Sequence, residues 1–312
     1  MIRYWSVPPE KCEAIVRPDP EFIRQWLSVR PGVLSQEHQD IFAPNCRSQN
    51  QPADFSRVER VEHWQDADVI VCQHWFDLAM ASGRRVTIEK LIDFVRSTYR
   101  DKVYAFSWNH DTDAAYMQEF NQLPKSSVLL QYNTSRPNPH DLLLPFWTSI
   151  VQVEPQPKTI RCIFRGYIGG SLRCRKYLKM CCDGKEGIVV TGTRLESDAY
   201  MRELASATFA LCPRGGGLNS YRLYEAIACE AIPVLYADNA VLPYPEIGWE
   251  SFSIRLPEQQ ATNWRLLDET MRAADVPKMQ ERLRDVKRRF SLAGVQEAVA
   301  DRLATMIPRA IA

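Results

Sequence analysis

The sequence of 312 residues lacks several features that mark special classes of protein. It has no run of the roughly 18 uncharged apolar residues that a membrane-spanning helix needs. Its start holds Arg3 and two prolines where a signal peptide would have an apolar core. Its net charge is only +1, which gives no reason to expect a nucleic acid as partner. We therefore expect a cytoplasmic protein with no membrane span and no nucleic-acid partner.

The nine cysteines lack the spacing of a metal site or of a disulfide framework. Nine is an odd number, and most of the cysteines stand inside apolar runs such as VIVCQ and FALCP. The adjacent pair Cys181 and Cys182 has neither CxxC spacing nor a histidine nearby. We expect buried thiols in a reducing compartment and no metal site.

Hydrophobic patterning predicts two α/β domains, at residues 1–150 and 151–312. The chain is long enough for two domains of about 150 residues each. Its second half, which carries a slight excess of positive charge, alternates short β-branched runs with amphipathic segments. That alternation is typical of βα units on a parallel sheet. The predicted strands are 160–164, 187–191, 209–213, 232–237 and 252–256, and the predicted helices are 171–182, 197–207 and 219–230.

The first half repeats this pattern less regularly. A helix is predicted over 86–99, where apolar residues recur at helical spacing. The proline-containing segment 151–159 is predicted to be the interdomain linker. A last helix over 293–307 has one apolar face, which could pack back on the first domain. The predicted strands of this half are 2–7, 67–73, 102–108, 127–132 and 141–146.

The densest chemical signal is a glycine turn after the predicted strand FALCP. Gly215, Gly216 and Gly217 allow the backbone to approach a ligand closely. Asn219 and Ser220 are good N-caps for the next helix, whose free N–H groups and positive dipole end favour an anion. The turn fits neither GxxxxGK[ST] nor GxGxxG, so both of those nucleotide-binding motifs are disfavoured. A tight turn that binds no ligand is the structural alternative.

Charged residues crowd this turn. Arg214 precedes the glycines, and Arg222 and Glu225 follow three residues apart on one helical face. Arg222 and Glu225 are consistent with a ligand site and equally with a surface ion pair, which would contribute a few tenths of a kcal/mol.

The run CPRGGGLNSYRLYEAIACEAIPVLYADNAVLPYPEIGWESFSIRLPE (212–258) resembles the signature region of the exostosin-like glycosyltransferases. It has that family's CPRG turn, S-x-R-x-x-E-A helix, I-P-V strand and W-x-x-F-S-I segment. FRGYIGGSLRCRKYL (164–178) is similar to the family's first C-domain strand and loop, and FSWNHDTDAA (106–115) to its HDWG-type segment. Thr112 and Asp113 stand where the family commonly has Trp and Gly, a departure on the acceptor side.

The resemblance implies a GT-B fold, in which two Rossmann-like, doubly wound domains face each other across a cleft. It implies an inverting hexosyl- or pentosyltransferase of polysaccharide biosynthesis. This enzyme would transfer sugar from a UDP-sugar to a glycan acceptor, with no metal and no cofactor besides the donor. Gly217 stands where retaining relatives place a glutamate, which agrees with inversion. A non-catalytic relative that binds a glycan or a partner protein stays open, and so does the less favoured sugar-nucleotide epimerase.

A transferase without a metal must neutralise the leaving diphosphate with arginines and helix N-termini. The resemblance implies that the donor lies against two loops and the helix after them. Glu225 is then expected to accept hydrogen bonds from the ribose hydroxyls. The predicted donor-binding residues are Arg165, Gly166, Arg173, Arg214, Gly215, Gly216, Asn219, Ser220, Arg222 and Glu225.

For the base that deprotonates the acceptor hydroxyl, we favour Asp111. It follows the predicted strand 102–108, and the carboxyl ends of strands in α/β sheets face the ligand crevice. His110, Asp113 and His74 are its rivals. Asp111 could equally cap the segment that follows it.

Overall fold

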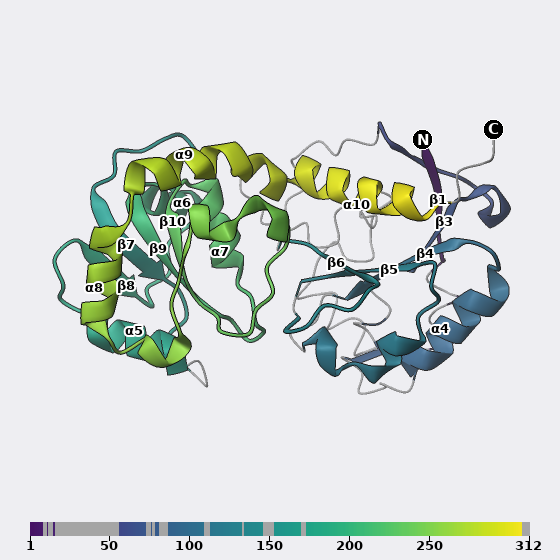
Figure 1. Ribbon diagram of the computed structural model, residues 1–312, viewed down its shortest axis with the longest axis horizontal. Helices are drawn as coiled ribbons and strands as arrows, with labels where there is room; N and C mark the ends of the chain where they lie inside the picture. The colour runs from purple at the N-terminus through teal and green to yellow at the C-terminus, as the bar shows by residue number, and fades with distance from the viewer. Residues whose placement is uncertain are drawn as a thin grey trace. The chain divides into compact units, whose positions relative to one another are not determined.

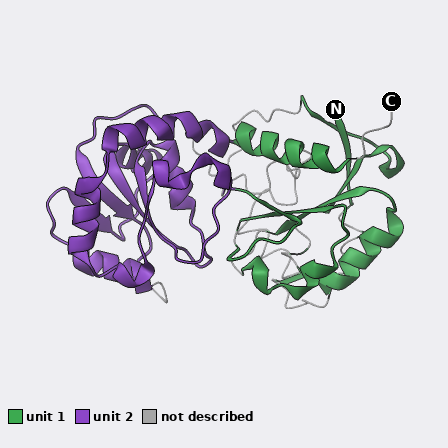
Figure 2. Ribbon diagram, in the orientation of Figure 1, with its two compact units in different colours: residues 1–144, 292–312 green, residues 145–291 purple. Residues whose placement is uncertain are grey.

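The computed structural model divides into two compact units (Figures 1 and 2). Unit 1 comprises residues 1–144 and 292–312, and unit 2 comprises residues 145–291. The chain thus divides at Pro145, a few residues before the predicted boundary. Residues 292–312, which the predicted boundaries included in the second domain, belong to unit 1, on which the last helix was expected to be able to pack back. The residues described are 1–8, 11, 15, 56–72, 76, 79–80, 87–108, 113–132, 134–145, 153–169 and 173–307.

The C-terminal helix α10 (Leu292–Met306) explains this difference. Its buried residues include Val295, Val299 and Leu303, and it contacts the first strand of unit 1. An apolar helical face must be covered, and unit 1 supplies the cover. None of the helices described is long and apolar enough to cross a membrane.

Unit 1 is built on a six-stranded parallel sheet with the order β2-β1-β3-β4-β5-β6. The three strands β3, β4 and β5 are buried along their whole length, as central strands covered on both faces are. Helix α4 buries Ile88, Leu91, Ile92 and Val95, the apolar residues of the predicted helix. The bounds are β1 (Ile2–Ser6), β2 (Val58–Arg60), η1 (Trp64–Asp66), β3 (Val69–Cys72), α4 (Thr87–Thr98), β4 (Val103–Trp108), η2 (Ala114–Tyr116), η3 (Gln118–Gln122), β5 (Ser127–Gln131) and β6 (Asp141–Leu143).

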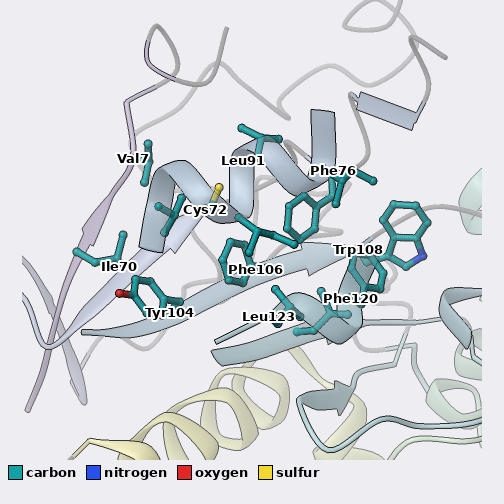
Figure 3. Close-up of a cluster of buried hydrophobic side chains, with 14 of the residues drawn as sticks. Val7, Ile70, Cys72, Phe76, Leu91, Tyr104, Phe106, Trp108, Phe120 and Leu123 are labelled. Atoms are coloured by element: carbon teal, nitrogen blue, oxygen red, sulfur yellow. The ribbon is translucent and has the colours of Figure 1, made fainter. Parts of the chain in front are cut away.

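An aromatic cluster packs against β4 in the core of unit 1 (Figure 3). Phe76 stacks on Phe106 with ring centroids 5.1 Å apart, and Trp108 meets Phe120 edge-on at 5.2 Å. Trp108 is fully buried, as expected for a tryptophan at a strand end. Burial of one such side chain stabilises a fold by about 1.5–3 kcal/mol. The core therefore anchors the carboxyl end of β4, where the predicted base segment begins.

Unit 2 is built on a five-stranded parallel sheet with the order β11-β10-β9-β7-β8. In chain order this is 2-1-3-4-5, a doubly wound arrangement whose topological switch point lies between β7 and β9. Its bounds are β7 (Ile160–Arg165), α5 (Arg173–Cys182), β8 (Ile188–Thr191), α6 (Ser197–Ala205), β9 (Ala207–Pro213), α7 (Tyr221–Ala228), β10 (Ile232–Tyr236), η4 (Pro245–Ile247), η5 (Trp249–Ser251), β11 (Ile254–Arg255), η6 (Glu258–Gln260), α8 (Trp264–Ala273), α9 (Val276–Val286) and η7 (Lys287–Phe290).

The predicted fold class, α/β with two Rossmann-like domains, is confirmed. Every predicted strand and helix is present with bounds shifted by a few residues. Strand β2 and helices α8 and α9 were not predicted. Strand β2 has three residues and buries only one of them, which is too short for a periodic signal. The buried residues of α8 and α9 recur at helical spacing, so the sequence does carry a signal for both helices.

Candidate active site

The predicted glycine turn lies at the switch point of unit 2. Strands β7 and β9 are parallel neighbours, so the loops after Arg165 and Pro213 leave the same edge of the sheet. The Gly215 N–H donates to the Asn219 carbonyl at 3.1 Å, which closes the turn. Ser220 then caps α7 by accepting from the Arg222 N–H at 3.4 Å. Ligands of open α/β sheets bind at such a point, which supports a ligand here.

The Arg222 side chain folds back from α7 onto the end of β7. Its guanidinium lies 4.6 Å from the Phe164 ring centroid and donates to the Arg165 carbonyl. A Cβ placed on Gly166 would come within 2.8 Å of Arg222 Nη2, so only glycine leaves room for this guanidinium. The Arg222 Nε is buried and has no hydrogen-bond partner among the residues described.

A second guanidinium, that of Arg175 on α5, lies 5.7 Å from the same Phe164 ring. Its Nε donates to the Arg214 carbonyl and its Nη1 to the Tyr167 carbonyl, both at 3.2 Å. The Arg175 side chain is buried, and this burial together with the charge of Arg222 lowers its pKa. Arg175 was not among the predicted residues. Its neighbour in the sequence, Arg173, was predicted instead, but it is solvent exposed.

Within the part of the chain that the structure describes, neither Arg175 nor Arg222 forms an ion pair with a carboxylate. Their partners are carbonyl oxygens, which carry no full charge. Arg175 is buried and Arg222 is half-buried, and positive charges withdrawn from water without a carboxylate partner attract an anion to the site. The glycine turn and the N-terminus of α7 favour an anion at the same place. The arrangement can therefore neutralise a phosphate or diphosphate.

Two of the predicted arginines are engaged by carboxylates. Arg165 forms a bidentate pair with Glu203, with its Nε and Nη2 each 2.6 Å from a carboxylate oxygen. Arg214 Nε lies 3.2 Å from Glu258 Oε2. Each carboxylate already neutralises its arginine, which leaves less positive charge for a bound anion. The roles of Arg165 and Arg214 in donor binding therefore stay predictions.

Glu225, on α7, contacts α6. The Tyr200 hydroxyl donates to Glu225 Oε2 at 2.6 Å. Burial and the Glu225 charge raise the pKa of Tyr200, which keeps its proton on the hydroxyl. Glu225 Oε1 has no hydrogen-bond partner among the described residues and can accept from a ligand hydroxyl. No sequence signal pointed to Tyr200, because it lies on another helix.

The other predicted donor-binding residues shape the turn. Asn219 is buried and its Nδ2 donates to the Tyr224 hydroxyl at 2.7 Å. Gly216 is exposed at the tip of the turn. In the described ranges, no group of three or more histidine, cysteine, aspartate or glutamate side chains is placed to hold a metal ion.

Of the predicted bases, only Asp113 lies among the described residues, and His110, Asp111 and His74 lie outside them. Asp113 is buried, and its Oδ1 accepts from the backbone N–H groups of Ala115 at 2.9 Å and Ser135 at 3.0 Å. The carboxylate thus caps η2 and fastens a second loop to it. The geometry assigns Asp113 a structural role.

The matches to known proteins include residues of both units. The family model for the exostosin GT47 domain matches residues 93–271 of this chain. A probable glucuronosyltransferase of Oryza sativa subsp. japonica is 31% identical over 94 residues, which are 30% of this chain and 22% of the relative. The exostosin-1 homolog of Caenorhabditis elegans is 40% identical over 63 residues, 20% of this chain and 16% of the relative.

A probable glucuronoxylan glucuronosyltransferase of Arabidopsis thaliana is 32% identical over 94 residues, 30% of this chain and 21% of the relative. The matches thus span about a fifth of the length of these curated relatives. Among solved structures, the calicheamicin glycosyltransferase CalG4 aligns with a TM-score of 0.40 and 11% identity, over 79% of this chain and 75% of that one. Because the GT47 model matches more than half of its residues, the chain belongs to the exostosin GT47 domain family of glycosyltransferases.

Proposed function

We propose that this chain is an inverting glycosyltransferase that transfers a sugar from a UDP-sugar to a glycan acceptor without a metal ion. The observation that carries the proposal is the pair of guanidinium groups at the glycine turn of unit 2, that of Arg175 buried and that of Arg222 half-buried, which lie near the same Phe164 ring. The names of the curated relatives, which include glucuronosyltransferases, support a sugar donor.

In this proposal, Arg175 and Arg222 bind the diphosphate beside the N-terminus of α7. The negative charge on the diphosphate grows as the bond to the sugar breaks, and buried cations stabilise such charge more strongly than exposed ones do. Glu225, held by Tyr200, accepts hydrogen bonds from the ribose hydroxyls. Two guanidinium groups thus supply the positive charge that a metal ion would otherwise bring.

The transfer itself is a direct displacement at the anomeric carbon. The acceptor hydroxyl forms a bond on one face of the sugar, and the bond to the diphosphate breaks on the other, with its electron pair leaving on UDP. The hydroxyl proton passes to a base, for which Asp111 stays our first proposal and His110 and His74 its rivals. Gly217 at the position of the glutamate of retaining relatives supports inversion.

One observation favours the alternative of a non-catalytic relative. Asp113, in the segment that departs from the family pattern, is engaged by two backbone N–H groups and caps η2. A protein of this kind would keep the donor site or a glycan site and lack turnover.

Calorimetric titration with UDP in the presence of EDTA tests the donor site. We expect UDP to bind the wild-type protein, and Arg175→Gln or Arg222→Gln to weaken binding by about tenfold or more, because each removes a charge-assisted contact. Lys176→Gln, on the exposed side of α5, is the matched control and should change the affinity by less than about twofold. Unchanged affinity in both arginine variants would refute the assignment.

Turnover is tested separately, by incubating the protein with UDP-sugars and glycan acceptors. Acceptor-dependent release of UDP with inversion at the anomeric carbon supports the transferase. UDP binding without any release supports the non-catalytic alternative, and an isomerised sugar nucleotide formed without acceptor identifies an epimerase.

A further inference from the structure

A groove of about 500 Å³ lies at the other end of the unit 2 sheet from the glycine turn. Arg161, the second residue of β7, and Gly187, which precedes β8, place it at the amino ends of these strands. Arg161 and Arg165 are separated by about 13 Å along β7, at roughly 3.3 Å per residue. The groove is therefore distinct from the proposed donor site. Its lining residues are Arg161, Lys185, Glu186, Gly187, Trp264, Asp268, Met271 and Arg272.

Trp264, the first residue of α8, gives the groove an aromatic wall. Its side chain is only partly buried, and its Nε1–H has no hydrogen-bond partner among the residues described. The Lys185 ammonium lies 5.6 Å from the ring centroid. The indole thus offers a flat apolar face, a free N–H donor and an adjacent positive charge at one place.

A network of charges lines the groove beside Trp264, because Asp268 and Arg272 follow Trp264 on the same face of α8. Asp268 Oδ1 lies 2.6 Å from Arg161 Nη1, and Asp268 Oδ2 accepts from Arg272 Nε at 2.9 Å. Hydrogen bonds from Arg272 and Arg161 lower the pKa of Asp268, so the carboxylate keeps its charge. One carboxylate between two guanidinium groups leaves this network with a net positive charge. Met271, which is buried, also lines the groove.

We propose that this groove binds an acidic pyranose oligosaccharide. The carbon-bound hydrogens on one side of a pyranose ring fit the Trp264 face, and a carboxylate on that sugar would lie within reach of Lys185. Lys185 forms no ion pair within the described chain, so its charge is available to a ligand. The exposed carboxylate of Glu186 can accept from sugar hydroxyls. The volume lies within the range of about 300–1,000 Å³ that is typical of ligand sites.

Calorimetric titration of the full chain tests the proposal with three probes: a hexamer of galacturonic acid, cellohexaose and sodium sulfate. We expect only the acidic hexamer to bind. Trp264→Ala should weaken its binding by about tenfold or more, since removal of a contacting aromatic ring costs at least about 1.4 kcal/mol. Trp264→Phe keeps a ring and lacks the N–H, so its loss should be smaller. Lys185→Gln should also weaken binding and reduce its dependence on salt.

Arg265→Gln is the matched control, because Arg265 follows Trp264 directly, is exposed and does not line the groove. It should bind the hexamer as the wild type does. No binding by the wild type, equal binding of cellohexaose, competition by millimolar sulfate, or wild-type affinity in both Trp264 variants would each overturn the proposal.

The donor site and the groove can fail independently in these experiments. Trp264→Ala should keep the wild-type affinity for UDP, and Arg175→Gln should keep the wild-type affinity for the hexamer. If Arg175→Gln instead loses the hexamer while the Trp264 variants keep it, the acidic chain binds at the glycine turn and the groove proposal is wrong.

Discussion

At the scale of single residues, the arginines of unit 2 differ in what pairs with them. Among the residues described, Arg165 and Arg214 pair with carboxylates, whereas Arg175 and Arg222 do not. Arg175 and Arg222 donate to carbonyl oxygens and lie near the Phe164 ring, and Arg222 also lies 5.9 Å from the centroid of the Tyr200 ring. All four are cationic, and a charge without a carboxylate partner attracts an anion more strongly than a paired one does. Pairing therefore makes Arg175 and Arg222 the stronger candidates for binding a diphosphate.

Gly166 is expected to matter through the space that it leaves. In Gly166→Ala, the new methyl group would come within 2.8 Å of Arg222 Nη2 and displace the guanidinium. UDP binding, measured by calorimetry, should weaken by about tenfold while the midpoint of thermal unfolding changes little. Gly192→Ala is the control, because a methyl group there would meet Ile168 at 3.6 Å and the Gly166 carbonyl oxygen at 3.8 Å, both ordinary contact distances. Equal UDP affinity in both variants would contradict the role of Gly166.

Tyr200 is expected to position Glu225 and not to touch the diphosphate. Tyr200→Phe removes the hydrogen bond of 2.6 Å and leaves the carboxylate less well oriented. UDP affinity should fall by about threefold to tenfold, the usual worth of a hydrogen bond to a charged group. The affinity for 2′-deoxy-UDP should change much less, because the lost contact concerns the ribose hydroxyls. An equal loss for both nucleotides would place Tyr200 elsewhere in the mechanism.

At the scale of elements, Lys158 joins the ends of two helices. Its Nζ donates to the carbonyls of Ala205, Cys229 and Glu230, which lie at the ends of α6 and α7. The last carbonyls of a helix have no partner within the helix, so a cation there stabilises both elements. Helix α6 carries Tyr200 and α7 carries Arg222 and Glu225, so this contact also supports the site.

Lys158→Met should therefore destabilise unit 2. Three carbonyls would exchange a charged donor for water, and we expect the free energy of unfolding to fall by about 1–2 kcal/mol. Urea denaturation measures this loss. Lys176→Met, which removes an exposed lysine of α5, serves as control. A midpoint equal to that of the wild type would show that the three contacts contribute nothing.

Strand β6 of unit 1 begins at Asp141, whose carboxyl group is largely withdrawn from water. Burial raises the pKa of Asp141 from 3.8 to about 6, although the Asn138 N–H donates to its Oδ2 at 2.7 Å. The folded state therefore binds this proton more tightly than the unfolded state does. Protonated Asp141 therefore contributes stability to the folded state below about pH 4, and this contribution is lost as the pH rises through 6.

Asp141→Asn should remove this loss, because its amide oxygen can still accept from Asn138 and carries no charge. At about 1.4 kcal/mol per pKa unit, the gain at pH 7 is at most about 3 kcal/mol, and it should vanish near pH 4. Thermal unfolding of both proteins at the two pH values measures the difference. A variant that is less stable than the wild type at pH 7 would contradict the prediction.

At the scale of the whole molecule, the chain crosses from unit 1 to unit 2 and returns. Val299 on α10 is fully buried in unit 1, so Val299→Asp should destabilise unit 1 by about 3 kcal/mol or more. Unit 2 should keep its UDP affinity at temperatures where unit 1 has become sensitive to protease. Ala304→Asp, at an exposed position of the same helix, is the control. Simultaneous loss of UDP binding would argue against two separately packed units.

The sequence by itself determined most of the elements and the place of the turn. Alternation at period two and spacing near 3.6 are local properties, so α4 and all strands of the two sheets except β2 could be predicted from neighbouring residues. The glycine turn of residues 215–217 and its caps could be predicted for the same reason. The resemblance of residues 212–258 to the exostosin family then predicted a donor site there.

Only the tertiary structure decided which charges are paired. Arg165 meets Glu203 from another βα unit, 38 positions along the chain, and Arg175 reaches the glycine turn from α5. The unit to which α10 belongs was decided in the same way, by the surface that covers its apolar face. Partners of this kind come from distant elements that packing brings together, and no spacing within a segment encodes them.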